Sequence, residues 1–165
     1  MFDYVNHIIK VLKKAQQTNP ILTHFLIKYP SKQIMQSNNC IYVGFSEAKA
    51  TSRTHHSQDY DELIDIIITT KQLDYFECSK ILKVVSNLIL HELRKDDIIH
   101  DKISPISFMY KYNSDNTLKF GELLISCNTT ENYNDVFDIE DDDLVYDIVC
   151  SIKGYVGEND GKEER

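Results

Sequence analysis

The chain has 165 residues, 42% of them hydrophobic, which is enough to bury one core without metal ions or disulfide bonds. Its 26 acidic side chains outnumber 18 Lys and Arg, and the net charge of −8 disfavours duplex DNA or an anionic membrane surface as the main partner. No basic segment followed by an apolar run opens the chain, and no stretch reaches the ~18 apolar residues of a membrane span, which predicts a soluble, cytoplasmic protein.

Two helical segments are predicted near the N-terminus. Apolar side chains at helical spacing form a narrow stripe over residues 3–17, and Asn19 and Pro20 end this helix. The same spacing recurs over residues 22–29 and stops before Pro30. This second run predicts a shorter helix or a single helical turn.

Two β-strands are predicted over residues 40–45 and 61–70. The first segment alternates β-branched and aromatic residues, and three isoleucines at alternate positions share one face of the second strand. Between them, residues 46–58 are small, polar or charged and include no Gly or Pro for a tight turn. This composition indicates a long solvated hairpin arm or a mobile loop.

An amphipathic helix over residues 73–93 is the clearest element of the sequence. Its apolar residues recur at spacings of three and four, so that one stripe faces one side. Asp74 can cap the first turn together with Glu77, while Arg94 and Lys95 lie near the negative end of the helix dipole. We expect the stripe to pack against the apolar face of a sheet.

A hairpin is predicted after this helix, with strands over residues 106–112 and 117–128 and a turn at residues 113–116. The apolar alternation of the return strand changes phase near Gly121, which predicts a β-bulge. The resulting order α-β-β-α-β-β predicts an α+β fold, with a mainly antiparallel four-stranded sheet and helices packed on one face.

The four cysteines lie far apart in the sequence. Cys40, Cys78, Cys127 and Cys150 include no C-x-x-C pair, and three of them stand within apolar segments. This spacing predicts reduced, buried thiols rather than a disulfide framework or a zinc site.

The chain becomes acidic beyond the hairpin. We expect one α+β domain over residues 1–130 and an acidic C-terminal extension over residues 131–165, with one short element and a disordered tail. The short element lies at residues 144–152, after an acidic run. Its flanking residues favour a helix, whereas its strict alternation would also suit a strand.

One cluster of residues raises the question of metal chemistry. His55 and His56 stand near Asp59, Asp61 and Glu62, and imidazole and carboxylate groups can share a transition metal. Adjacent histidines in an extended segment point to opposite faces, so a solvated loop is the favoured interpretation. A metal-dependent hydrolase using His55, His56 and Asp59 remains the alternative.

Other catalytic signatures do not occur in the sequence. The acidic run at residues 138–143 lacks the Gly and the closing Glu of a calcium loop, and no glycine-rich phosphate loop or nucleophile elbow is present. We therefore expect a protein that is not an enzyme, with no catalytic residues, metal ion or cofactor.

The order of elements resembles the tail terminator, or tail completion, proteins of long-tailed bacterial and archaeal viruses and prophages. The similarity covers about the first 130 residues as a match of topology. The segments that carry it are residues 2–12, CIYVGF at 40–45, YDELIDIIITT at 60–70, the helix at 75–93 and the hairpin at 106–126.

The resemblance implies a structural virion protein whose copies form a ring of six, which ends the tail tube and joins it to the head connector. The expected partners are other copies, the tail tube protein and the head-tail connector, without nucleic-acid specificity or membrane binding. The polar arm, with Lys49, Arg53, His55 and His56, would contact a neighbouring subunit. Another neck, head-closure or minor capsid role remains open.

Overall fold

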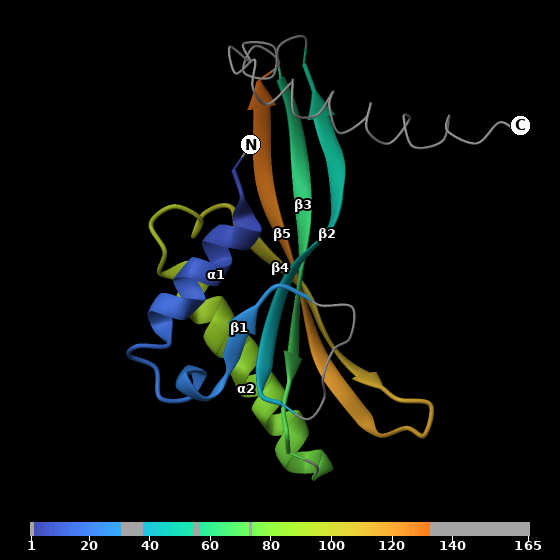
Figure 1. The fold of residues 1–165 in the computed structure, drawn as a ribbon. Coiled ribbons are helices and arrows are strands. Elements are labelled where there is room, and N and C mark those ends of the chain that lie inside the picture. Colours follow the sequence, from blue (N-terminus) through green and yellow to red (C-terminus); the bar gives the residue numbers. More distant parts are fainter. Residues whose placement is uncertain (1, 31–37, 55–56, 73, 133–165) are drawn as a thin grey trace, which may run out of the picture.

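The computed structural model describes residues 2–30, 38–54, 57–72 and 74–132, and these residues form five strands and two α-helices (Figure 1). In chain order the elements are α1 (Tyr4–Ala15), the 3-10 helix η1 (Leu22–His24), β1 (Leu26–Lys28), β2 (Cys40–Arg53), β3 (Ser57–Thr69), α2 (Tyr75–Arg94), β4 (Ile103–Tyr112) and β5 (Leu118–Asn132). The predicted α+β class is confirmed. None of the described helices has the length and hydrophobicity to cross a membrane.

Helix α2 forms where the sequence predicts it. Asp74 is the N-cap, and its carboxylate accepts a hydrogen bond from the amide of Glu77 at 3.0 Å. The apolar stripe is fully buried at Leu82, Val85 and Ile89, so the helix owes its position to burial against the sheet. Both predictions for this helix, the cap and the buried face, are confirmed.

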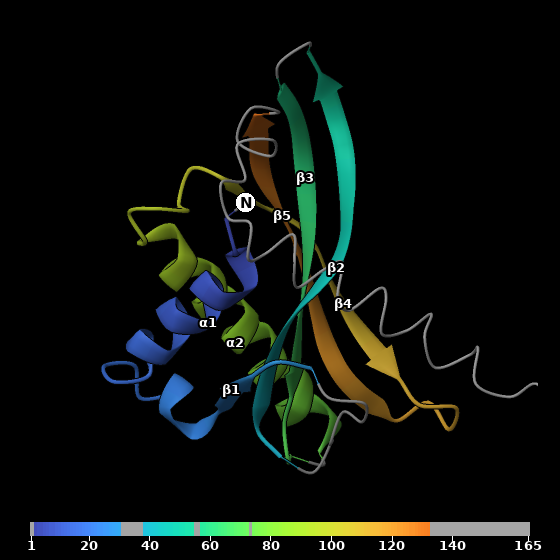
Figure 2. The same cartoon turned by 45° about the horizontal axis from the view of Figure 1, so that its top comes forward.

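Helix α1 packs beside α2 on the same side of the sheet (Figures 1 and 2). The carboxylate of Asp3 caps it by accepting a hydrogen bond from the amide of Asn6 at 2.9 Å. His7 Nε2 lies 2.8 Å from Asp96 Oδ1, in the segment that follows α2, and this hydrogen bond joins the two helical segments. The helix layer thus has polar contacts as well as an apolar core.

The sheet differs in detail from the one the sequence predicts. It is a mixed sheet in the order β1-β2-β3-β5-β4, in which β1 pairs in parallel with β2 and the other neighbours are antiparallel. The expected second helix is reduced to η1, and residues 26–28 form the additional strand. Phe25 and Ile27 are buried and Leu26 is exposed, an alternation that suits a strand edge rather than a helix.

The core lies between the two helices and the middle strands. The alternating isoleucines of β3, Ile64, Ile66 and Ile68, are fully buried on the helix side, as their spacing predicts. Three cysteines, Cys40, Cys78 and Cys127, are free and buried, which confirms the prediction for them. Burial raises the pKa of the Cys127 thiol to about 12. Cys150 lies outside the described residues.

The β4–β5 hairpin turns at the predicted residues, with Asn116 in the left-handed region at a φ of 63°. The register shifts where Lys111 pairs with Phe120 and Tyr112 with Leu118. Lys119 is therefore the extra residue of β5, two positions from Gly121, where the sequence predicts a bulge. A Cβ atom at Gly121 would stand 2.9 Å from the ring of Phe108, so glycine permits this aromatic ring to pack on the strand.

The greatest difference concerns the segment at residues 46–58. β2 continues to Arg53 and β3 begins at Ser57, so this segment is mostly strand, and the mobile-loop alternative is wrong for its described residues. Backbone hydrogen bonds between strands do not require apolar side chains. The polar composition of this segment therefore did not indicate that it forms strands. The acidic run and the short element at 144–152 lie outside the described residues.

Candidate assembly surface

Three strands extend beyond the helix layer and form an arm, defined here as residues 46–53 of β2, 57–62 of β3 and 128–132 of β5. Figures 1 and 2 show these strands continuing past the end of α1. Every residue of β2 from Phe45 to Arg53 is exposed. The arm is therefore the part of the sheet that is open to contact with another molecule.

Polar side chains connect the strands of the arm where no apolar core is present. The hydroxyl groups of Ser52 on β2 and Thr130 on β5 both donate hydrogen bonds to Asp59 on β3, the latter at 2.6 Å. These two bonds, first that from Ser52, lower the pKa of the Asp59 carboxyl group. Asn128 donates a further bond to Asp61 at 3.2 Å. The arm thus holds a defined shape through polar contacts between its strands.

Both outer edges of the arm lack a strand partner among the described residues. β1 pairs with β2 only as far as Tyr42, and β4 pairs with β5 only as far as Cys127. An unpaired edge offers a row of backbone donors and acceptors to another chain. The arm accordingly provides two places where a strand could add.

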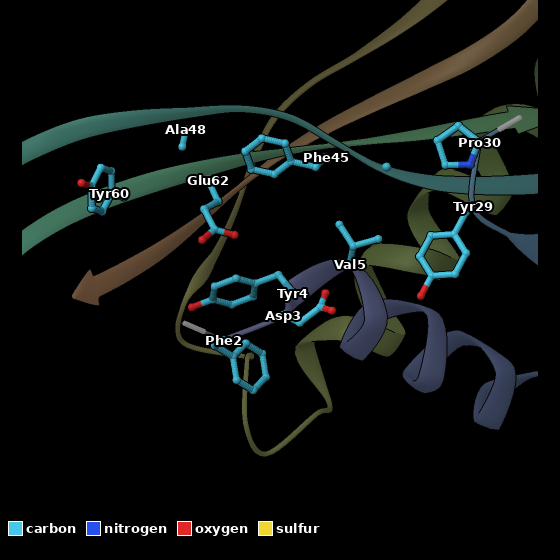
Figure 3. Close-up of a pocket in the computed structure, with 11 residues that line it drawn as sticks. Phe2, Asp3, Tyr4, Val5, Tyr29, Pro30, Phe45, Ala48, Tyr60 and Glu62 are labelled. Atoms are coloured by element: carbon cyan, nitrogen blue, oxygen red, sulfur yellow. The ribbon is translucent and has the colours of Figure 1, made fainter. Parts of the chain in front are cut away.

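A groove of about 690 Å³ lies at the base of the arm, between the start of α1 and the strands (Figure 3). The lining residues that the structure describes are mainly aromatic or acidic, with no Lys, Arg or His among them: Phe2, Asp3, Tyr4, Val5, Tyr29, Pro30, Gly44, Phe45, Ala48, Tyr60 and Glu62. Phe45 is 58% exposed and Tyr29 is 51% exposed, although both are large apolar side chains. Such an uncovered apolar surface is typical of a binding site.

The floor of the groove holds a buried carboxylate. Glu62 is only 8% exposed, and Figure 3 shows its carboxylate pointing toward the ring of Tyr4. The hydroxyl group of Tyr4 donates a hydrogen bond to the backbone oxygen of Asn128 at 2.7 Å, which fastens α1 to the base of the arm. Burial raises the pKa of Tyr4, and the negative charge of Glu62 acts in the same direction.

Two of the four predicted contact residues lie on the arm. Lys49 and Arg53 are both on the exposed part of β2, and the Lys49 ammonium group is 3.8 Å from the Glu47 carboxylate. His55 and His56 lie outside the described residues. No group of three or more His, Cys, Asp or Glu side chains within the described ranges is arranged to hold a metal ion.

The groove is the feature that sequence reasoning missed. Its aromatic residues come from separate parts of the chain, with Phe2 before α1, Tyr29 after β1, Phe45 on β2 and Tyr60 on β3. One signal was present in the sequence: Phe45 continues the apolar face of its strand directly into a polar segment. An apolar residue at that boundary indicates a surface that the helices do not cover.

Comparisons with known proteins give matches among solved structures. No family model matches the chain, and no curated protein matches it. Solved structures include 22 matching chains, one of them from "Virion of native gene transfer agent (GTA) particle". That match is 9% identical, covers 79% of this chain and all of the other, and has a TM-score of 0.45. A likeness this weak shows neither a shared fold nor a shared function.

Proposed function

We propose that this is a structural protein of a virion or prophage, whose copies assemble into a ring that ends the tail tube and joins it to the head connector. It acts through its contacts and without a catalytic group of its own. The proposal is supported by the resemblance in element order and by the arm. Its partners are other copies, the tail tube protein and the connector.

The arm is the observation that carries the proposal. Soluble proteins commonly protect strand edges with short strands, bulges or covering loops. Here β2 and β5 leave the helix layer with edges that have no strand partner among the described residues, yet polar cross-strand bonds keep the arm ordered. A pre-shaped projection lowers the entropic cost of association, because fewer groups become ordered on binding.

Assembly with the tail tube protein tests the proposed function. We expect rings in electron micrographs and a discrete oligomer of about six copies in native mass spectra, with tubes of a defined end when both proteins are mixed. The tail tube protein alone is the control. A chain that stays monomeric at high concentration, with the tube protein present, would contradict the proposal.

Metal analysis separates this proposal from the hydrolase that the histidine pair suggests. We expect purified protein to contain no stoichiometric zinc, manganese or iron. One metal ion per chain that disappears with His55→Ala would contradict a purely structural role and favour the hydrolase. Ala substitution at His91, which lies on α2, provides the matched control for the loss of a histidine.

A further inference from the structure

We propose that the groove receives the Arg53 side chain from the arm of a second copy, so that neighbouring copies join head to tail. This inference rests on the proposed function, because it names the contact through which the ring closes. It also identifies the two surfaces of the interface: the tip of β2 on one copy and the groove at the base of the arm on the next.

The chemistry of the groove suits a guanidinium group. Rings of Tyr4, Tyr29, Phe45 and Tyr60 line it, together with the carboxylates of Asp3 and Glu62. Arginine stacks on aromatic faces and pairs with carboxylates, and it loses less hydration energy than lysine when it enters a partly apolar site. No basic side chain occurs among the described residues that line the groove, so an incoming arginine meets two carboxylates and no like charge from this part of the chain.

Arg53 is the arm residue best placed to supply this group. It is exposed near the end of β2, and its side chain makes no hydrogen bond or ion pair with any residue in the described part of the chain. The other cation on this strand, Lys49, lies near Glu47 and on the face of the sheet that carries Asp61. An arm that places one uncommitted arginine at its end is complementary to an acidic aromatic groove.

The arginine must come from another copy. Arg53 pairs with Gln58, and the groove carboxylate Glu62 lies four residues away from Gln58 on β3, which is about 13 Å at a rise of about 3.3 Å per residue and beyond the reach of the arginine side chain. Pairing with β3 keeps β2 extended up to Arg53, so the tip cannot fold back onto its own base. A contact between two different patches is heterologous, and heterologous contacts generate rings or filaments.

A mixing experiment with two variants tests the contact. Arg53→Glu removes the arginine and leaves the groove open, whereas Ala48→Trp fills the groove and leaves Arg53 in place. We expect each variant alone to lose assembly, with association weakened at least about tenfold. An equimolar mixture should form dimers and stop there, because only one productive contact per pair remains. Sedimentation velocity and native mass spectrometry, with and without the tail tube protein, measure the products.

Matched controls isolate the charge and the volume. Lys80→Glu makes the same charge reversal at an exposed position of α2, and Gln17→Trp adds the same bulky ring at an exposed position after α1; both lie outside the arm and the groove and should assemble as the unchanged protein does. Circular dichroism should show that all four variants fold.

The outcomes distinguish the two proposals. If the unchanged protein forms rings and Arg53→Glu forms them equally well, or if the two variants give no dimers on mixing, this contact is wrong while the ring survives. If the unchanged protein forms no oligomer even with the tube protein, the proposed function fails and the contact fails with it.

Discussion

The two halves of β3 show how one strand can serve two purposes. Between Ile64 and Ile68 its inward side chains are completely buried against the helices, and hydrophobic burial holds this half in place. From Ser57 to Asp61 the side chains are half-buried and polar, and cross-strand bonds such as that from Thr130 to Asp59 hold the strand instead. The helix-covered half supplies stability, and the arm offers a shaped surface with little core of its own.

Hydrogen exchange should show the largest contrast between the two halves. Amides of β3 between Ile64 and Ile68 exchange only when the core opens, whereas those between Ser57 and Asp61 exchange when the arm frays. We expect protection on the order of 100-fold lower in the arm. In assembled protein the arm should gain protection. Equal protection in the free protein would show that the arm is as stable as the core.

Leu82→Ala should cause the largest loss of stability, about 2–5 kcal/mol in the free energy of unfolding, because it leaves a cavity between α2 and the sheet. Val84→Ala on the same helix is the matched control, since Val84 is 39% exposed and its loss should cost less than about 0.5 kcal/mol. Urea denaturation measures both. Similar losses for the two variants would contradict the assignment of the buried face.

Tyr4→Phe should have a smaller effect of about 1 kcal/mol, because it removes the hydrogen bond to the backbone of Asn128 and keeps the buried ring. Tyr75→Phe is the control: the Tyr75 hydroxyl group contacts that of Tyr112 at 3.2 Å in an exposed position. Exchange of arm amides should rise in Tyr4→Phe only. An unchanged arm would mean that α1 does not anchor it.

Protonation of the Asp96 carboxylate at low pH should lower the free energy of unfolding. Burial raises the pKa of this carboxyl group, but hydrogen bonds from His7 and from the amides of Ile98 and Ile99 outweigh burial and hold the pKa below its usual range. A lowered pKa stabilises the folded state above the unfolded value near 3.8, and this contribution disappears as pH falls through the folded value.

We therefore expect Asp96→Asn to be less stable at neutral pH and to show a shallower decline in unfolding free energy below about pH 4. Thermal unfolding at several pH values measures the slope. Asp97→Asn, beside it in the chain, is the control. Parallel curves for Asp96→Asn and the unchanged protein would contradict the role of this carboxylate.

Elements with local signals could be predicted from the sequence. The cap at Asp74, the stripe of α2 and the alternating isoleucines of β3 depend on spacing within one segment, and the structure confirms them. β1 could not be predicted, because three residues acquire strand structure only through pairing with β2. The length of the arm could not be predicted for a related reason. Its strands are stabilised by backbone pairing and polar hydrogen bonds, and hydrophobic periodicity does not reveal these interactions.

The candidate site was predictable in part. Polar composition indicated an exposed arm carrying Lys49 and Arg53, and the structure places both there, while their contacts with a neighbour stay a prediction. The groove could be identified only from the three-dimensional structure, because Phe2, Tyr29 and Phe45 come together only when α1 and β2 pack against each other. The sequence contained the parts of this surface but gave no sign of their proximity.

The two bulges of β2 have a consequence for how such a protein can change. Ser46 and Thr51 are each an additional residue, since Phe45 and Glu47 pair with Ile64 and Leu63, and the pairing resumes regularly beyond Thr51. A bulge increases the local twist and bends its strand. Deleting either residue would keep the register of the remaining cross-strand pairs and change the direction of the tip. Single-residue deletions can therefore change the direction of the arm, and with it the curvature of an assembly, without repacking the hydrophobic core.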